Sequence, residues 1–290
     1  MRFATLAIGG QPQVVLISPD NERYVPVLAP NGEPVRDMKA VIQDFDAYAN
    51  RLANPDGWQP VGDAQWLPPV LPSRNIFCVG KNYYEHAREF EKSGFDSSSG
   101  GEVVPTAPVV FTKAPSSAIG HLASIMPHSG LTEQLDYEAE LAVVIGRGGR
   151  GIRKADALNH VFGYTLVNDV TARDLQHRHR QWFLGKSLDT FCPMGPVLVT
   201  RDEVDGSTLN ISCRVNGELR QNANTRDLIF DIPTLIETIS AGIALQPGDV
   251  IATGTPAGVG IGLNPPQFLK SGDEIVVEVD GIGRLVNRVA

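Results

Sequence analysis

The stretch "DYEAELAVVIG", residues 136–146, joins an acidic beginning to a hydrophobic end. Asp136, Glu138 and Glu140 occupy alternate positions, and residues 141–145 form an apolar run typical of a buried strand. Side chains alternate between the two faces of a β-strand, so we expect all three acids on one face. We expect Asp136, at the mouth of the strand, to be exposed. Carboxylates arranged in this way either face solvent or bind a cation where the strand enters the core.

The composition is that of a soluble globular protein. The chain has 290 residues, 42% of them hydrophobic and 20% charged, which is enough for a large core. Its 29 glycines and 21 prolines favour turns and strands over helix bundles. The formal charge of −8 argues against a nucleic-acid partner, although a few local cations would still bind a small anion.

The cysteines and the hydropathy indicate neither secretion nor membrane insertion. Cys78, Cys192 and Cys213 are an odd number without CxxC spacing, which predicts buried thiols rather than disulfides or a zinc site. The N-terminus lacks a sustained apolar segment, and no apolar run of transmembrane length follows. We therefore expect a cytoplasmic protein with no membrane partner.

The proline-rich run at 66–75 divides the chain. Before it, short strands and one helical stretch predict a small N-terminal α/β domain, which we assign to residues 1–72. The remaining residues, 73–290, form the larger domain. Most of that domain reads as strands, with helices expected at 154–161, 171–182 and 232–241.

The balance of elements predicts an α+β fold. Strands outnumber helices and do not alternate with them regularly, which favours a mixed β-sheet rolled into a barrel-like core. The C-terminal "DEIVVEVDGIGRLVNRV" predicts a hairpin that turns at Asp280 and Gly281.

A helix and a polar segment follow the first strand of the larger domain. The stretch "NYYEHAREFEKSG" predicts a helix that Asn82 caps and Gly94 ends. The next residues, "FDSSSGGE", are small and polar. A helix followed by such a segment is typical of a lid, so we expect residues 90–105 to become ordered when a ligand binds.

Three carboxylates form a candidate metal site. Glu138 and Glu140 are two apart on a strand, which puts their Cα atoms about 6.5–7 Å apart on one face. Asp169 ends another apolar strand, "FGYTLVND". An all-oxygen set suits Mg²⁺, Mn²⁺ or Ca²⁺ better than zinc. The alternative is a solvent-facing strand whose charges bind nothing.

Residues 146–151, "GRGGRG", match the GxGxxG fingerprint of dinucleotide-binding folds and lie between a strand and a predicted helix. The acids on the preceding strand count against this interpretation. The first strand of such a fold is normally buried on both faces, and carboxylates repel a pyrophosphate. We favour a glycine-rich turn and keep dinucleotide binding as an alternative.

The segment after Asp169 supplies candidate cations. If Thr171 caps a helix, Arg173, Gln176 and Arg180 fall on one face of it. An arginine there can pair with a carboxylate through two hydrogen bonds. The sequence therefore predicts a basic side to the acidic site.

Two further segments offer groups that bind anions. Lys186 is the only cation of "GKSLDTFCPMGP", a segment too apolar for a typical exposed loop. The glycine-rich "ATGTPAGVGIG" presents backbone amides and the hydroxyls of Thr253 and Thr255, which could hold a carboxylate. His177 and His179 diverge on their helix, so we expect them at the surface or in an interface.

Five segments together resemble the fumarylacetoacetate hydrolase family. They are "VGKNYYEHAREF", "DYEAELAVVIG", "VNDVTARDLQ", "GKSLDTFCPMGP" and "ATGTPAGVG", in the order of that family, and the resemblance spans residues 72–290. Each segment alone is weak evidence, but five in order are specific. The resemblance implies that Glu138, Glu140 and Asp169 bind Mg²⁺ or Mn²⁺, with Ca²⁺ as a further option.

The resemblance also implies roles for the other candidate residues. These are substrate binding by Arg173, Gln176 and Thr253, an active-site lysine at Lys186, and activation of water by His86 and Glu89 on the lid helix. Larger members of the family add an aspartate ligand upstream of the histidine. Lys81 and Asn82 stand there in this chain, so we expect three protein carboxylates on the metal.

The expected reaction is metal-dependent hydrolysis of a carbon–carbon bond in a 1,3-diketo acid of acylpyruvate or fumarylpyruvate type. His86, oriented by Glu89, would deprotonate a water, and Lys186 would stabilise the pyruvate enolate that leaves. Three alternatives use the same site: oxaloacetate decarboxylation, keto–enol isomerisation or tautomerisation of an unsaturated keto diacid, and hydrolysis of a 2,4-diketo-3-deoxy sugar acid. A ligand-binding protein without activity is a further alternative.

The expected partners are a small anionic keto acid and a second copy of the chain in a homodimer. We expect no nucleic acid among them.

Overall fold

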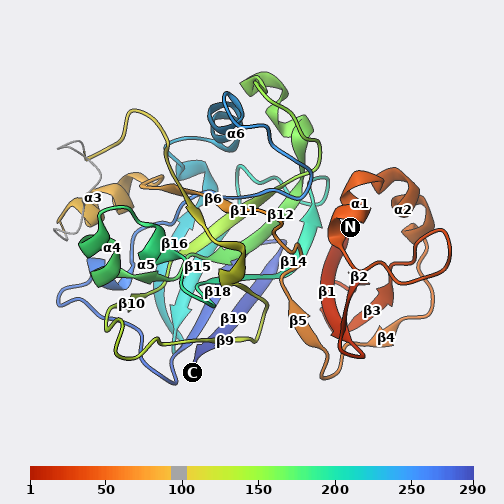
Figure 1. The fold of residues 1–290 in the computed structure, drawn as a ribbon, viewed down its shortest axis with the longest axis horizontal. Helices are drawn as coiled ribbons and strands as arrows, with labels where there is room; N and C mark the ends of the chain where they lie inside the picture. Colours follow the sequence, from red (N-terminus) through yellow and green to blue (C-terminus); the bar gives the residue numbers. More distant parts are fainter. Residues whose placement is uncertain (93–102) are drawn as a thin grey trace.

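Two β-sheets packed face to face form the body of the protein (Figure 1), in a computed structural model that describes residues 1–92 and 103–290. The larger sheet runs, in spatial order, through β4 (Gln59–Pro60), β3 (Arg23–Pro26), β2 (Gln11–Ile17), β1 (Arg2–Ile8), β14 (Cys192–Thr200), β12 (Val161–Asn168), β11 (Ala139–Ile145), β17 (Val250–Ala252), β6 (Ile76–Gly80) and β7 (Val109–Lys113). Two short strands join it at the side, β5 (Gln65–Leu67) beside β1 and β8 (Ala118–Ile119) beside β14.

The smaller sheet covers the middle of the larger one. Its order is β16 (Glu218–Asn224), β15 (Asn210–Val215), β18 (Glu274–Val279), β19 (Gly283–Val289) and β9 (Ser124–Ile125). Strands β15, β18 and β19 lie against β11, β12 and β14 of the larger sheet. A separate pair, β10 (Leu135–Asp136) and β13 (Thr171–Ala172), stands next to the entry of β11.

Helices lie at the two ends of the molecule and on one side (Figure 1). At the N-terminal end are α1 (Met38–Gln43) and α2 (Phe45–Leu52), and at the opposite end are α3 (Tyr84–Lys92), α4 (Arg173–His179) and α5 (Phe183–Lys186). Helix α6 (Ile232–Ser240) packs against the 3₁₀ helix η2 (Lys154–His160). Three shorter 3₁₀ helices are η1 (Pro115–Ser117), η3 (Thr225–Asp227) and η4 (Gly260–Gly262).

The mixed α+β character is confirmed, but closure into a barrel is not. Within the described ranges, the path of the larger sheet stays open, with β4 at one edge and β7 at the other. The N-terminal strands extend this sheet, since β1 pairs with β14 through Arg2↔Val199 and Phe3↔Leu198. Core side chains therefore fill the space between two sheets. The division into residues 1–72 and 73–290 stays a prediction.

Several local predictions are confirmed. The segment 232–241 forms α6, where Asp231 caps the first turn by accepting a hydrogen bond from the amide of Thr234 at 2.9 Å. The C-terminal hairpin is β18 and β19, and it turns at Gly281, whose φ of +76° lies in the left-handed region. The segment 154–161 is helical as a 3₁₀ helix. The three cysteines are buried free thiols.

The predicted single helix at 171–182 is wrong. Thr171 belongs to β13, and its hydroxyl donates to the carbonyl oxygen of Asp169 rather than capping a helix. Helix α4 then ends at His179, because Arg180 adopts a φ of +59°, and α5 begins at Phe183. Arg180 is exposed and does not share the buried face of Arg173 and Gln176.

The dinucleotide alternative is excluded by the topology around residues 146–151. Strand β11 pairs antiparallel with β12, whereas a dinucleotide fold needs a parallel β-α-β unit at this point. The glycine-rich stretch is a turn that exchanges backbone hydrogen bonds with Leu245 through Gly149.

The lid prediction falls mostly on residues 93–102, which lie outside the described residues, as does Gly94. We expected Asn82 to cap helix α3, but its side chain bonds to other segments. Its side-chain amide donates to the carbonyl oxygens of Phe230 and Thr253, and its oxygen accepts from the amide of Phe230. Asn82 therefore links the start of the helix to two distant segments.

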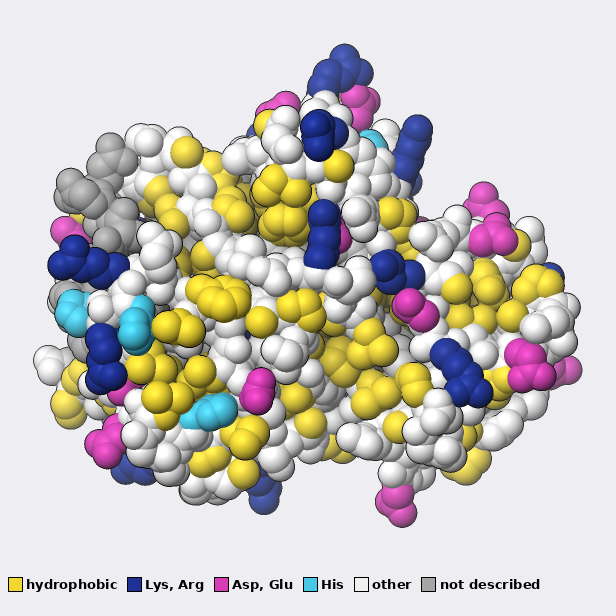
Figure 2. All heavy atoms as spheres, in the orientation of Figure 1, with side chains coloured by type: hydrophobic (Ala, Val, Ile, Leu, Met, Phe, Trp, Pro, Cys, Tyr) yellow, Lys and Arg dark blue, Asp and Glu magenta, His cyan; other side chains and the backbone are white. Residues whose placement is uncertain are grey.

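The predicted surface position of the two histidines on α4 is confirmed. His177 and His179 are exposed on α4, and Figure 2 shows histidine side chains on the surface over this helix. Among the described residues, no helix is long and apolar enough to cross a membrane.

The core position of Phe3 provides a test of whether the N-terminal strands belong to the main core. Phe3 is fully buried and contacts the rings of Phe45 and Phe162. We expect Phe3→Ala to lower the free energy of unfolding by about 3–5 kcal/mol through the cavity it leaves. Urea denaturation measures this, with the exposed Leu122→Ala as a control that changes it by less than about 0.5 kcal/mol. A loss below about 1 kcal/mol would contradict the shared core.

Candidate active site

Three carboxylates from two adjacent strands converge at one end of the larger sheet. Glu138 immediately precedes β11, Glu140 lies within it, and Asp169 immediately follows β12. The strands pair antiparallel, so the start of one lies beside the end of the other. Each residue offers a carboxylate oxygen within 4.8 Å of the others, and all three side chains are buried. The predicted set of metal ligands is therefore brought together.

The chemistry of this donor set fits a divalent cation. Burial, followed by the charges of Asp169 and Glu138, raises the pKa of Glu140 well above its usual range. Glu138 behaves in the opposite way. Burial opposes its ionisation, but Lys186 and Arg173 outweigh burial and lower its pKa to about 2. A hard cation held by oxygen ligands would offset the charge of Glu140 in the same way.

Two buried lysines pair with the carboxylates from the side. The Nζ of Lys186 donates to Glu138 Oε2 at 2.9 Å and to Asp169 Oδ2 at 2.7 Å. The Nζ of Lys113 donates to Asp169 Oδ1 at 2.6 Å and to the carbonyl oxygen of Val170 at 3.1 Å. Lys186 was expected at the site, but Lys113 was not. Its signal in the sequence is a lysine at the end of the apolar strand "VVFTK".

The expectation of an exposed Asp136 is wrong. Asp136 is fully buried in β10, a short strand separate from β11. Its carboxylate accepts hydrogen bonds from Arg173 Nε at 2.8 Å and from the amides of Gly260 and Ile261 at 2.7 and 3.0 Å. Asp136 therefore fixes the position of the Arg173 guanidinium.

Arg173 pairs with carboxylates, as its position predicts. Besides Asp136, it contacts Glu138 Oε1 through Nη2 at 2.7 Å, and its Nη1 donates to Gln176 Oε1 at 3.1 Å. Both Arg173 and Gln176 are buried and line the pocket beside the triad. Their contacts with substrate stay a prediction.

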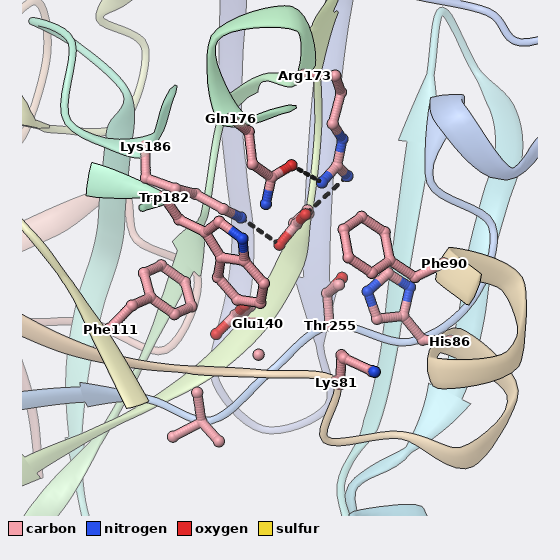
Figure 3. Close-up of a pocket in the computed structure, with 13 residues that line it drawn as sticks. Lys81, His86, Phe90, Phe111, Glu140, Arg173, Gln176, Trp182, Lys186 and Thr255 are labelled. Carbon is pink, nitrogen blue, oxygen red and sulfur yellow. Dashed lines mark hydrogen bonds and ion pairs between the residues drawn. The ribbon is translucent and has the colours of Figure 1, made fainter. Parts of the chain in front are cut away.

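Glu138 and Glu140 line a small pocket, and Figure 3 shows the residues around it. Three aromatic rings, those of Phe90, Phe111 and Trp182, form one part of its wall. The remaining lining residues include the polar side chains of Lys81, His86, Arg173, Gln176, Lys186 and Thr255. The space open to the centres of water molecules is about 10 Å³, which is room for about one water.

The predicted histidine–glutamate pair lies at the edge of this pocket. Nδ1 of His86 is 3.3 Å from Glu89 Oε2, and the two residues are one turn apart on α3. The carboxylate of Glu89 also accepts from the amide of Gly258 at 3.0 and 3.2 Å. His86 is buried and lines the pocket, so the pair has the geometry of an oriented proton carrier.

The two threonines of the "ATGTPAGVGIG" segment lie in different places, and a substrate contact of Thr253 stays a prediction. The hydroxyl of Thr253 donates to the carbonyl oxygen of Leu141 at 2.9 Å, and the residue is fully buried immediately after β17. Thr255 lines the pocket instead and accepts a hydrogen bond from Gln221 Nε2 at 2.8 Å. The chain leaves β17 and turns at Gly254, whose φ is +107°, so the pocket receives the second threonine of the motif.

The fold and this site define a class of enzyme with a buried, carboxylate-lined candidate metal centre. Residues 75–290 match the family model described as fumarylacetoacetate (FAA) hydrolase C-terminal, and the chain belongs to this family. Named relatives in the comparisons include a hydrolase, an isomerase and a tautomerase. The resemblance inferred from five sequence segments is confirmed.

The relatives differ in their named activities. The chain is 55% identical over 224 residues to oxaloacetate tautomerase YisK of Bacillus subtilis strain 168. The aligned region covers 77% of this chain and 71% of the relative. Among solved structures, the fumarylacetoacetate hydrolase of Exiguobacterium antarcticum has a TM-score of 0.83 at 41% identity, covering 100% of this chain and 99% of the other. The 2-hydroxyhepta-2,4-diene-1,7-dioate isomerase of Mycobacterium marinum has a TM-score of 0.76 at 32% identity, covering 100% and 98%.

Removing one charge tests the candidate metal centre. Glu140→Gln keeps the size of the side chain, and we expect it to abolish the binding of Mg²⁺ and Mn²⁺ in calorimetric titrations. The free energy of unfolding of the metal-free protein should stay equal or rise, because burial and two neighbouring carboxylates already disfavour the charge of Glu140. Glu85→Gln on the exposed side of α3 is the matched control and should change neither quantity. Unchanged Mn²⁺ affinity in Glu140→Gln would contradict the metal centre.

Proposed function

We propose that this protein is a keto–enol tautomerase of 2-keto diacids of the oxaloacetate type, and that it uses Mg²⁺ or Mn²⁺. The observation that carries the proposal is the 55% identity to a relative named as an oxaloacetate tautomerase. The sequence by itself favours carbon–carbon hydrolysis, with decarboxylation and isomerisation as alternatives. The relatives support the isomerisation alternative better than hydrolysis.

Tautomerisation needs one proton to leave C3 of the substrate and one proton to reach the oxygen on C2. His86 is suited to the first task, because Glu89 holds its Nδ1 and leaves the other ring nitrogen for the pocket. The reverse reaction returns the proton to C3 from the same nitrogen. No bond between heavy atoms forms or breaks, so the residues need only carry protons and stabilise charge.

Lys186 is suited to stabilising the enolate oxygen. Burial disfavours its charged form, but Asp169 and Glu138 outweigh burial and raise its pKa. An ammonium group that lines the pocket is suited to stabilising negative charge on a substrate oxygen. A divalent cation held by Glu138, Glu140 and Asp169 would supply Lewis-acid polarisation of the keto group.

The aromatic wall of the pocket is suited to a reaction that passes through an enolate. Phe90, Phe111 and Trp182 are apolar walls, and the free space holds about one water molecule. An enolate in such a site is protected from bulk water, which would otherwise compete for protonation.

Hydrolysis of an acylpyruvate is the second candidate function. The His86–Glu89 pair favours it, because a histidine oriented by a carboxylate can deprotonate a water as readily as a carbon acid. The likeness to the Exiguobacterium antarcticum hydrolase points in the same direction. An acylpyruvate, which only the hydrolase would cleave, distinguishes the two candidates.

The decisive experiment compares two substrates. With saturating Mn²⁺, we expect the protein to convert enol-oxaloacetate to the keto form faster than buffer does, followed by ultraviolet absorbance. His86→Ala should lower kcat/KM by about 10²–10⁴-fold, since it removes the proposed proton carrier. The exposed His179→Ala is the matched control and should retain full activity.

Two results would contradict the proposal. Cleavage of acylpyruvates without any acceleration of enol-oxaloacetate conversion would replace the tautomerase by the hydrolase. A full tautomerase rate in His86→Ala would keep the activity but remove His86 from the proton path.

A further inference from the structure

The indole N–H of Trp182 is an unused hydrogen-bond donor in the wall of the pocket. Trp182 is 7% exposed, and among the described residues no acceptor pairs with its Nε1. Buried donors are normally paired, because leaving one without a partner costs stability. An unpaired donor that borders a ligand pocket therefore suggests a ligand atom as the missing acceptor.

The ring of Trp182 is held rigidly before any ligand arrives. A Cβ atom at Gly80 would lie 2.4 Å from Cζ3 of the ring, so only glycine leaves room for it. Phe111 meets the ring edge-on with centroids 5.2 Å apart, and Phe90 does so at 6.2 Å. Donors fixed in this way lose little freedom when they bind a ligand, which favours their use in recognition.

The surroundings of the indole nitrogen are rich in donors. Figure 3 shows this nitrogen on the side of the pocket where Gln176 and Lys186 lie. The oxygen of Gln176 accepts from Arg173, so its amide nitrogen is the end that remains for other partners. The carboxylate of Glu138 on this side is already paired with Lys186 and Arg173. The ligand group that complements this corner is a hydrogen-bond acceptor, and a carboxylate oxygen is one.

We propose that Trp182 selects 2-keto diacids over 2-keto monoacids by donating its indole N–H to the second carboxylate of the substrate, the one remote from the keto group. This inference deepens the proposed function, on which it rests for the class of substrate. Oxaloacetate-type substrates carry such a carboxylate, and an aromatic wall without a donor would repel it. A site built around a hydrogen bond discriminates strongly against ligands that lack the partner group.

The test separates the indole N–H from the shape of the ring. Trp182→Phe keeps an aromatic side chain against Gly80 and Phe111 but removes the donor. The probes are 3,3-difluoro-oxaloacetate, a diacid that cannot enolise, and oxalate, which lacks the remote carboxylate. With saturating Mn²⁺, we expect calorimetry to give about 10-fold or more weaker binding of the diacid to the variant, and oxalate binding changed less than about 2-fold.

A matched control is Trp66→Phe, at a tryptophan that is also 7% exposed but packs against His121 away from the pocket. It should bind both probes as the unmodified protein does. Equal weakening of both probes in Trp182→Phe would mean that the residue only shapes the pocket, and this would overturn the proposal. Unchanged binding of the diacid would overturn it as well.

A second measurement keeps the inference testable if Trp182→Phe does not fold. In the unmodified protein, 3,3-difluoro-oxaloacetate should bind about 10-fold or more tightly than 3,3-difluoro-2-oxobutanoate, in which a methyl group replaces the remote carboxylate. Equal affinities would overturn the inference. If the diacid preference and its loss in the variant are observed but enol-oxaloacetate is not converted, the proposed function fails and Trp182 remains a determinant of diacid binding.

Discussion

The balance of buried charge at the start of β11 and the end of β12 is the constraint on which the site depends. Four buried carboxylates, Asp136, Glu138, Glu140 and Asp169, meet three buried cations that pair with them, Lys113, Arg173 and Lys186. Buried charges are tolerated when each has a partner, and an unpaired one is costly. Burial and the charges of Asp169 and Glu138 raise the pKa of Glu140. A divalent cation would compensate the charge of this carboxylate.

One glycine-rich loop connects the two halves of this site. The amide of Gly258 binds Glu89, which orients His86, and the amide of Gly260 binds Asp136, which holds Arg173. The loop packs tightly against neighbouring backbone at both positions, so glycine is required there. A Cβ atom at Gly258 would lie 1.9 Å from the carbonyl oxygen of Arg220, and one at Gly260 would lie 2.1 Å from that of Gln267. The proton carrier and the basic side of the pocket are thus positioned by the same segment.

The same polar groups are compatible with several reactions of keto acids, so the wall of the pocket decides among them. A cation, a lysine and a histidine can stabilise and protonate an enolate whether it arises by deprotonation or by bond cleavage. Phe90, Phe111 and Trp182 limit how much water enters and which substituent fits. The specificity of this chain therefore resides in its aromatic residues more than in its carboxylates.

The sequence by itself determined the parts of the site that rest on local patterns. Alternation of acids before an apolar run located Glu138 and Glu140, the ends of strands located Asp169, and segments in a family order located His86, Glu89 and Lys186. Only the tertiary structure decided the rest, because the partners are distant in the chain. Lys113 meets Asp169 across 56 positions, Asp136 is buried by amides 124 and 125 positions away, and a turn at Gly254 selects Thr255 over Thr253. Closure of the sheet was likewise undecidable from periodicity, which gives the faces of strands but not their neighbours.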